Sequence, residues 1–289
     1  MTNLSFAPAK VNLYLHVLGR RADGYHEIDS LFVFCDLGDW VDVRPADDLA
    51  LEVDGPFAKD ISSENIVLQA AAELREVCKI HQGAAIRLSK LLPVAAGLGG
   101  GSSDAAAAIR GLCELWNLDP TAHEVVALAS RLGSDVPACL VAQSVIVGGT
   151  GSRVIARPAL PVLTLVIINP GVAVATAEVY RRSVIVGQNA PRSTEPPAEL
   201  PTLIPWLAAR SNHLTGAARA IAPEIDQVLT FLESQSGCLL ARLSGSGATC
   251  FGVFGDPAAA TAAVSEATYE HPKWWARAAI TSLENIRQP

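Results

Sequence analysis

The chain has 289 residues, 50% of them hydrophobic and 18% charged, a composition that excludes an intrinsically disordered protein. Its formal net charge of −7 provides no general attraction to nucleic acid or to an anionic membrane surface. No segment is long and apolar enough to span a membrane, the N-terminus lacks a signal-peptide pattern, and the six cysteines form no C-x-x-C pair. We therefore expect a cytoplasmic protein with buried, reduced thiols and, because its histidines lack ligand spacing, no structural zinc.

Alternating apolar residues from Leu4 to about Leu37 predict a β-hairpin, with a turn signal at residues 19–24. Lys10 lies in the first strand of this hairpin. A lysine in such a strand is more often a charge that protects a sheet edge from aggregation than a functional group. Asn12, two residues further on, is predicted to share the face of the strand on which Lys10 lies, and it is a candidate second polar contact.

The region after the hairpin is predicted to form a strand, a helix and a second strand, over residues 40–44, 62–78 and 84–89. Ser62 or Ser63 is suited to cap the helix. Asn65 is suited to the start of this helix. Lys90 directly follows the second strand and leads into a glycine-rich segment.

This glycine-rich segment precedes a predicted core helix. Glycines allow a ligand to approach main-chain N–H groups, and a helix start directs unpaired N–H groups and its positive dipole end toward the same spot. A simple glycine turn is the commoner explanation of such a cluster, but two serines suited to cap the helix favour an anion site. The segment matches neither a P-loop nor a G-x-G-x-x-G motif. The predicted phosphate-binding residues are Pro93, Val94, Ala95, Ala96, Gly97, Leu98, Gly99, Gly100, Gly101, Ser102 and Ser103.

A further helix is predicted over residues 121–132, started by a capping box of Thr121 and Glu124. Asp135 comes next, two residues before Pro137. An Asp at this position is ordinarily a turn residue or a helix N-cap.

From about residue 156 the pattern changes to an alternation of strands and helices that is typical of an α+β domain. Residues 187–205, rich in Pro, Ser and Thr, are predicted to form a surface excursion, and residues 244–249 a glycine-rich turn. The other predicted elements are strands over 162–168, 239–243, 249–254 and 274–281, and helices over 206–210, 223–234 and 257–267.

Four motifs together resemble the GHMP kinase superfamily and, within it, the family of 4-diphosphocytidyl-2-C-methyl-D-erythritol kinases of non-mevalonate isoprenoid biosynthesis. They are Ala7-Pro8-Ala9-Lys10, Asp23-Gly24-Tyr25-His26, the glycine-rich segment and Gly133-Ser134-Asp135-Val136-Pro137. The resemblance implies a two-lobed α+β fold. The N-terminal lobe, residues 1–155, would be similar to ribosomal protein S5 domain 2, and the C-terminal lobe, residues 156–289, would be ferredoxin-like.

The resemblance also implies a reaction, in which the γ-phosphate of ATP moves to the 2-hydroxyl of the cytidine diphosphate sugar-alcohol. It implies ATP as cofactor, with Mg²⁺ whose ligands the sequence does not identify. The implied catalytic pair is Lys10 and Asp135. Lys90 and Asn65 would join the glycine-rich segment at the nucleotide. The implied substrate contacts are Asn12, Tyr25, His26, Thr176 and Tyr180.

Two alternatives stay open. Another kinase of the superfamily, of the homoserine or mevalonate type, would keep the phosphate loop and lack a cytidine site, and a catalytically silent nucleotide-binding protein would keep the fold alone. Either tyrosine taken singly is explained as an ordinary surface or core ring, and relatives have phenylalanine where Tyr180 stands. The expected partner is a small molecule, with neither nucleic acid nor membrane, and the chain is expected to be a monomer or weak homodimer.

Overall fold

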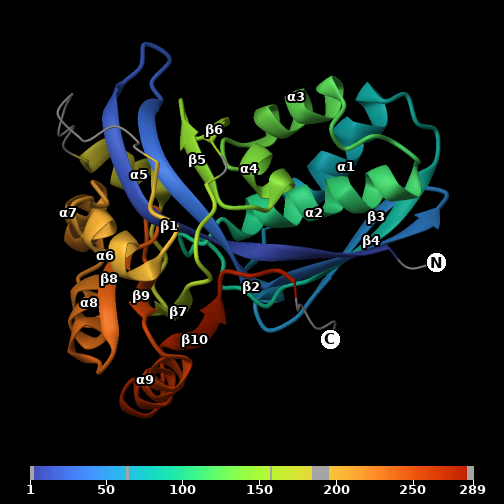
Figure 1. Ribbon diagram of the computed structural model, residues 1–289. Helices are drawn as coiled ribbons and strands as arrows, with labels where there is room; N and C mark the ends of the chain where they lie inside the picture. The colour runs from blue at the N-terminus through green and yellow to red at the C-terminus, as the bar shows by residue number, and fades with distance from the viewer. Residues whose placement is uncertain (1–2, 63–64, 157, 184–194, 285–289) are drawn as a thin grey trace. The chain divides into compact units, whose positions relative to one another are not determined.

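The computed structural model describes residues 3–62, 65–156, 158–183 and 195–284 (Figure 1). The chain divides into two compact units that interleave along the sequence. Unit 1 comprises residues 1–10, 38–94 and 99–143, and unit 2 comprises residues 11–37, 95–98 and 144–289. The lobe boundary expected between residues 155 and 156 stays a prediction.

The predicted hairpin is confirmed, and both of its strands are longer than expected. Strand β1 spans Asn3–Arg20 and pairs with β2, which spans His26–Ala46. The separate strand expected at residues 40–44 is therefore wrong, because β2 continues through it without a break. Both strands contribute residues to each of the two units.

Unit 1 is a helical layer on a small sheet. The helices lie on one face of β3 and β4 (Figure 1), and α2 is buried along Ala105–Ile109 and at Leu112. Strand β4 is parallel to β3 and antiparallel to the C-terminal part of β2. The elements are β3 (Leu49–Asp54), a 3-10 turn η1 (Ala58–Asp60), α1 (Ile66–Val77), β4 (Gly83–Ser89), α2 (Gly100–Leu115), α3 (His123–Leu132) and α4 (Val136–Val141).

Three expected helix starts in unit 1 are wrong. The cap of α1 is Asn65, whose Oδ1 accepts a hydrogen bond from the Val67 N–H at 2.8 Å, rather than Ser62, and Ser63 lies outside the described residues. The N-cap of α2 is Gly99, rather than one of the two serines.

The expected capping box of α3 does not form either. The Thr121 hydroxyl donates to Asp119 at 2.7 Å, and the N-cap residue is Ala122. The hydroxyls of Ser103 and Thr121 thus take other partners, Pro8 and Asp119, which a helix-start motif in the sequence does not indicate.

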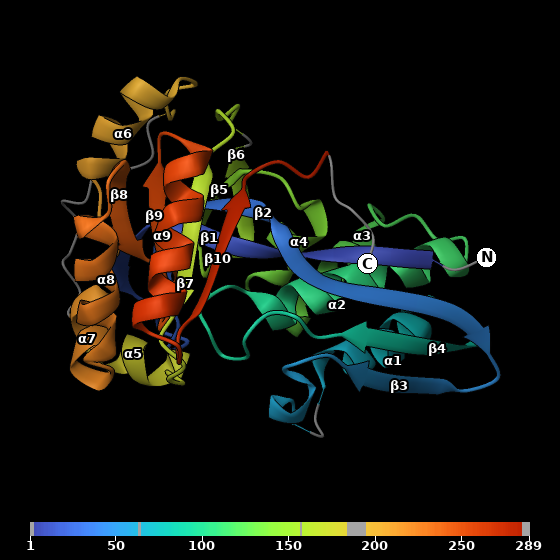
Figure 2. The ribbon, with the colours of Figure 1, turned by 90° about the horizontal axis from the view of Figure 1, so that it is seen from below.

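Unit 2 contains a four-stranded antiparallel sheet in the order β10, β7, β9, β8. Helices α8 and α9 pack against it, and Figure 2 shows α9 in front of its strands. The first part of β2 pairs with β5, and β5 with β6. The elements are β5 (Val145–Gly148), β6 (Arg153–Ala156), β7 (Thr164–Asn169), α5 (Thr176–Arg182), α6 (Leu200–Ala208), α7 (Thr215–Ile221), α8 (Glu224–Ser234), β8 (Cys238–Leu243), β9 (Cys250–Phe254), α9 (Pro257–Glu270) and β10 (Trp275–Ile280).

Most predicted elements of unit 2 are confirmed within two or three residues. The excursion expected over residues 187–205 is too long, because α6 already begins at Leu200 and contains Pro205; its residues 187–194 lie outside the described residues. Helix α7 was not expected at all. All six cysteines are free thiols, as expected, although Cys78 and Cys238 are only half-buried.

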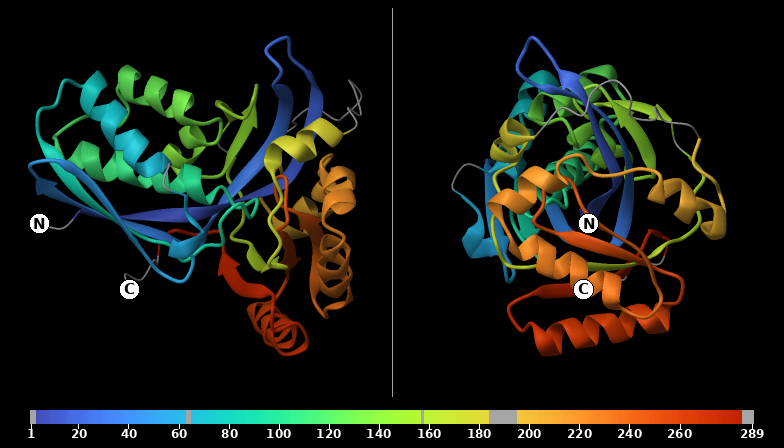
Figure 3. Two further views of the ribbon diagram at one scale, coloured as in Figure 1. Left: turned by 180° about the vertical axis from the view of Figure 1, so that it is seen from behind. Right: turned by 90° about the vertical axis from the view of Figure 1, so that its left-hand side faces the viewer.

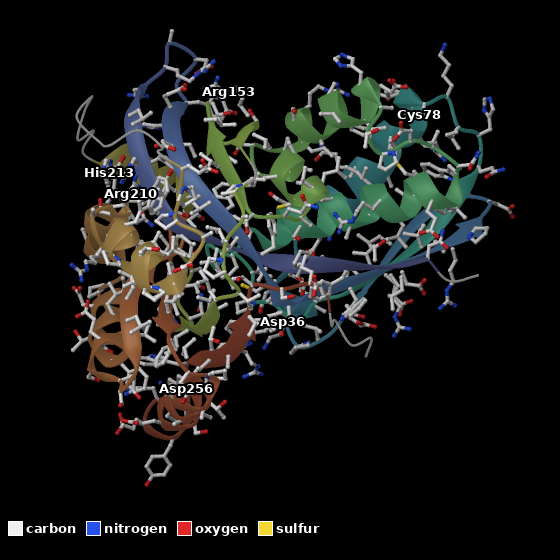
Figure 4. The ribbon with its side chains drawn as sticks, viewed as in Figure 1. Asp36, Cys78, Arg153, Arg210, His213 and Asp256 are labelled. Carbon is white, nitrogen blue, oxygen red and sulfur yellow. The ribbon has the colours of Figure 1, made fainter. Side chains whose placement is uncertain are left out.

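Two histidines bind the segment before α7 to β1. The His213 Nδ1 accepts a hydrogen bond from the Val17 N–H at 3.0 Å, and the His16 Nε2 accepts one from the Ser211 N–H at 3.3 Å. Their rings stack at 4.7 Å between centroids, and Figure 4 labels His213 beside β1. A ring nitrogen accepts such a bond only in neutral imidazole.

This arrangement predicts an acid-sensitive fold. Burial lowers the pKa of His213 below its ordinary value of about 6.5, so the unfolded chain binds this proton more readily than the folded one. The stability contribution of neutral His213 is therefore complete above about pH 6.5 and is lost as the pH falls toward the folded pKa. Between pH 7 and pH 5, the free energy of unfolding measured with urea should fall less in His213→Gln than in the parent. An equal loss in both proteins contradicts the assignment.

Candidate functional site

Lys10 and Asp135 form an ion pair in unit 1, with 2.9 Å between the Lys10 Nζ and the Asp135 Oδ2. The ammonium is buried, with 5% of its side chain exposed, whereas 27% of the Asp135 side chain is exposed. Asp135 holds the N-cap position of α4, but its carboxylate makes no capping hydrogen bond. The Asp135 carboxylate is therefore held by Lys10 rather than by the start of α4, and part of it stays exposed.

The start of α2 lies against this pair. Gly99 has a left-handed backbone with φ of 65°, and a Cβ at this position would lie 2.9 Å from the Lys10 Cε. The first N–H groups of a helix have no intrahelical acceptor, and a glycine N-cap supplies no side-chain acceptor. The geometry therefore presents main-chain donors and the positive end of a 16-residue helix next to a lysine, which is an arrangement suited to a phosphate.

The two serines of the segment have different surroundings. Ser103 is buried, and its hydroxyl donates to the Pro8 carbonyl at 2.7 Å, so it ties α2 to β1. Ser102 is half-buried, and its Oγ lies 3.9 Å from the place that a Cβ of Gly133 would take. Ser102 thus faces the segment that carries Asp135.

Lys90 is the centre of a buried charge cluster. Its Nζ lies 2.5 Å from the Asp39 Oδ2 and 2.7 Å from the Asp104 Oδ2, and at most 3% of each side chain is exposed. Asp39 also accepts hydrogen bonds from the Leu91 and Leu92 N–H groups at 2.5 and 2.8 Å. The cluster thus joins β2, the entry of the glycine-rich segment and the first turns of α2.

The charged groups in this cluster shift one another's pKa values. Burial alone would lower the pKa of Lys90, but the carboxylates of Asp104 and Asp39 outweigh it and raise that pKa. Burial raises the pKa of Asp104 well above its usual range, against the attraction of Lys90. Sequence reasoning missed Asp39 and Asp104, because they lie 51 and 14 residues from Lys90 and no local spacing connects them.

The remaining predicted nucleotide residues are spread over both units. In unit 1, Asn65 uses its side-chain oxygen to cap α1, and Val94 is partly exposed. In unit 2, Ala96 and Leu98 are buried, and Gly97 has φ of 76°. Gly97 is tightly surrounded, because a Cβ there would lie 2.5 Å from the Ser244 carbonyl oxygen.

Asn12 is buried in unit 2, with 1% of its surface exposed. Its Nδ2 donates to the Ser30 hydroxyl at 3.0 Å, and its N–H donates to the Ser244 Oγ at 3.3 Å. Next along β1, the Tyr14 hydroxyl donates to Asp29 at 2.9 Å, and burial together with the charge of Asp29 raises the pKa of Tyr14.

The predicted cytidine contacts come from the β1–β2 turn and from α5, which lies beside the hairpin (Figure 3). His26 and Tyr180 face each other, with ring centroids 5.0 Å apart and planes inclined by 32°. Burial and the nearby charge of Arg20 lower the pKa of His26 and so favour a neutral imidazole. Tyr25 is 64% exposed, and its N–H donates to Asp23 at 3.1 Å within the turn.

The described residues contain neither a metal-binding cluster nor a membrane-spanning helix. Across residues 3–62, 65–156, 158–183 and 195–284, no three His, Cys, Asp or Glu side chains come together in a way that could hold a metal ion. Within those same ranges no helix is both long enough and apolar enough to cross a membrane.

The sequence matches two protein families. Residues 65–143 match the GHMP kinases N terminal domain, and residues 199–273 match the GHMP kinases C terminal domain. The chain is 47% identical to the 4-diphosphocytidyl-2-C-methyl-D-erythritol kinase of Paramagnetospirillum magneticum, over 95% of this chain and 97% of the relative. It is 45% identical to the kinase of the same name from Parvibaculum lavamentivorans, over 93% and 94%.

Solved structures agree with these matches. A crystal structure of 4-(cytidine 5'-diphospho)-2C-methyl-D-erythritol kinase is similar with a TM-score of 0.76 and 34% identity, covering 96% of this chain and 98% of that one. A homoserine kinase from Cytophaga hutchinsonii is similar with a TM-score of 0.68 and 18% identity, covering 97% and 94%. The second likeness shows the fold alone. The expected α+β fold of the GHMP kinases is confirmed.

Proposed function

The chain belongs to the GHMP kinases and, within them, to the 4-diphosphocytidyl-2-C-methyl-D-erythritol kinases, and from this premise we propose how its residues carry out the reaction. It phosphorylates the 2-hydroxyl of 4-diphosphocytidyl-2-C-methyl-D-erythritol with ATP as donor, a step in isoprenoid precursor synthesis. The observation that carries this proposal is the Lys10–Asp135 pair beside the glycine start of α2, because it places a proton acceptor next to a phosphate-binding helix terminus.

Asp135 accepts the proton of the substrate hydroxyl as that oxygen attacks the γ-phosphate. Its partly exposed edge can reach a hydroxyl, and Lys10 fixes the carboxylate at 2.9 Å. Phosphoryl transfer depends mainly on in-line positioning and on stabilising charge at the transferred group. The Lys10 ammonium and the first N–H groups of α2 supply that charge stabilisation.

The nucleotide contacts are the glycine-rich segment, with Lys90 and Asn65 at its margins. The described residues offer no cluster that fits a metal ion held by protein side chains alone. Mg²⁺ ordinarily keeps several waters and binds through one or two carboxylates together with substrate phosphates. We therefore propose that Mg²⁺ enters with the phosphates of ATP, and we assign it no ligand in this chain.

The cytidine end of the substrate binds at Tyr25 of the β1–β2 turn, at His26 where β2 begins, and at α5. A planar base gains about 1–3 kcal/mol from stacking on each aromatic ring. His26 in its neutral form offers one donor and one acceptor nitrogen to the edge of the base. Thr176 and Asn12 are further polar contacts, and the Tyr180 ring offers a second stacking surface.

We expect Tyr25→Ala, His26→Ala and Tyr180→Ala each to raise the Kd for the cytidine substrate by about tenfold or more, because each loses a stacking or base-edge contact. The Kd for ATP should stay near the parent value. Titration calorimetry with each ligand measures both constants. Tyr269→Ala is the matched control, because Tyr269 is an 89% exposed ring on α9. Unchanged affinity for the cytidine substrate in all three variants contradicts the assignment.

A panel of alcohols tests the function as a whole. The protein is incubated with ATP and, in turn, with the cytidine substrate, homoserine and mevalonate, and the products are identified by mass spectrometry. We expect a phosphorylated product from the cytidine substrate alone. Turnover of homoserine or mevalonate supports a different kinase of this superfamily, and ATP binding without any product supports a silent nucleotide-binding protein.

A further inference from the structure

The glycine-rich turn of residues 244–249, called here the bracket turn, connects β8 to β9 in unit 2. Its first hydroxyl, of Ser244, donates to the Gly97 carbonyl at 2.9 Å. Its last N–H, of Thr249, donates to the Ala96 carbonyl at 3.1 Å. The bracket turn therefore holds two consecutive peptide groups of the glycine-rich segment in place.

A second hydroxyl of the same turn reaches a different segment. The Ser246 Oγ lies 2.9 Å from the Thr176 Oγ1, at the first residue of α5. Ser246 is 6% exposed, whereas Thr176 is on the surface. Tyr180 lies one helical turn after Thr176, so the residue that Ser246 contacts begins the helix that carries the aromatic ring facing His26.

Helix α5 needs such a contact. It has only seven residues, and its N-cap, Ala175, provides no side-chain capping bond. A helix of this length is marginal by itself and depends on tertiary contacts for a fixed position. The side chain of its first residue, Thr176, is held by the hydroxyl of Ser246.

We propose that Ser246 is a positioning residue for the cytidine substrate, acting through Thr176 and the start of α5. Ser244, two residues earlier, performs the corresponding task for Gly97 of the glycine-rich segment. One turn thus holds an ATP-binding segment and a substrate-binding helix through two separate hydroxyl groups. This assignment rests on the proposed function and adds a specificity-determining residue to it.

Steady-state kinetics of Ser246→Ala tests this assignment. A typical net hydrogen bond corresponds to about a three- to tenfold change, so the KM for the cytidine substrate should rise by about that factor while the KM for ATP stays constant. Ser246→Thr keeps the hydroxyl and should restore most of the affinity. Ser244→Ala, by contrast, should raise the KM for ATP, because it loses the hydrogen bond to Gly97. Ser265→Ala, which removes an exposed hydroxyl bonded within α9, is the control and should change neither constant.

A double-mutant cycle with Thr176→Val distinguishes positioning from general damage. If Ser246 acts through Thr176, the double variant should be little worse than Thr176→Val alone. Three results overturn the assignment: additive effects in the cycle, an equal rise in both KM values, or an unchanged KM in Ser246→Ala. The kinase function still holds in these cases if the parent phosphorylates the cytidine substrate. A parent protein that does not phosphorylate the cytidine substrate overturns the proposed function and this assignment with it.

Discussion

Asp135→Asn should lower kcat by about two to four orders of magnitude, the usual contribution of a general base. The amide has nearly the shape of the carboxylate but cannot accept the proton of the substrate hydroxyl. Because Asp135 makes no capping hydrogen bond in α4, the substitution should leave the fold intact. Since the start of α2 is unchanged, the KM for ATP should stay within a few-fold of the parent value. Initial rates at saturating substrates, with circular dichroism of both proteins, provide the measurement.

The chain offers a matched control for this substitution. Asp256 also holds a helix N-cap position ahead of a proline, at the start of α9 (Figure 4), and its Oδ2 does accept the Ala259 N–H at 3.2 Å. Asn is about as good an N-cap as Asp, so Asp256→Asn should keep both activity and stability. A kcat near the parent value in Asp135→Asn would contradict the catalytic assignment and leave Asp135 as an ordinary helix-start residue.

Lys90→Met should lower the free energy of unfolding by about 3–5 kcal/mol, the usual cost of removing one partner from a buried ion pair. Without the ammonium, the carboxylates of Asp39 and Asp104 lie together in a site where at most 3% of either side chain is exposed. Burial already raises the pKa of Asp104, so acid can neutralise Asp104 more easily than an exposed carboxyl group. The loss of unfolding free energy in Lys90→Met should therefore be smaller at pH 5 than at pH 8. Urea unfolding of both proteins at the two pH values measures it.

Arg87 provides the control for Lys90. It lies on β4, three residues before Lys90, and pairs with Asp54, but 57% of its side chain is exposed. Exposed pairs contribute about 0–1 kcal/mol, so Arg87→Met should be nearly neutral. If both variants lose a similar free energy of unfolding, burial is not the reason why breaking the Lys90 cluster is costly. Lost ATP affinity in a Lys90→Met protein of parent stability favours direct contact with the nucleotide.

The fold was predicted best where the spacing of apolar residues and the length of the segment indicate the same element. The hairpin of β1 and β2 follows from alternating apolar residues, and buried strands of the C-terminal sheet such as β7 and β9 follow from short apolar runs between turn signals. The helix caps could not be predicted in the same way. Ser103 donates to a carbonyl 95 residues earlier in the chain, and Thr121 prefers Asp119, so both hydroxyls are used for contacts that a local motif does not encode.

Some contacts of the candidate site could likewise be predicted from the sequence, and others could not. The family resemblance predicts Lys10 and Asp135 as a pair, and the structure places their charged groups 2.9 Å apart. The partners of Lys90 could not be predicted, since neither an Asp in a strand nor an Asp in the first turns of a helix is distinctive by itself. The contact of Ser246 with Thr176, 70 residues apart, likewise depends on how unit 2 folds.

The most direct test of the central claim is the position of the new phosphate. The protein is incubated with ATP and 4-diphosphocytidyl-2-C-methyl-D-erythritol, and the product is examined by ³¹P and ¹³C NMR. We predict one new phosphomonoester signal, coupled to carbon 2 of the methylerythritol, formed by the parent and almost absent with Asp135→Asn. A phosphate on any other carbon, or ATP consumption that leaves the alcohol unmodified, contradicts the account.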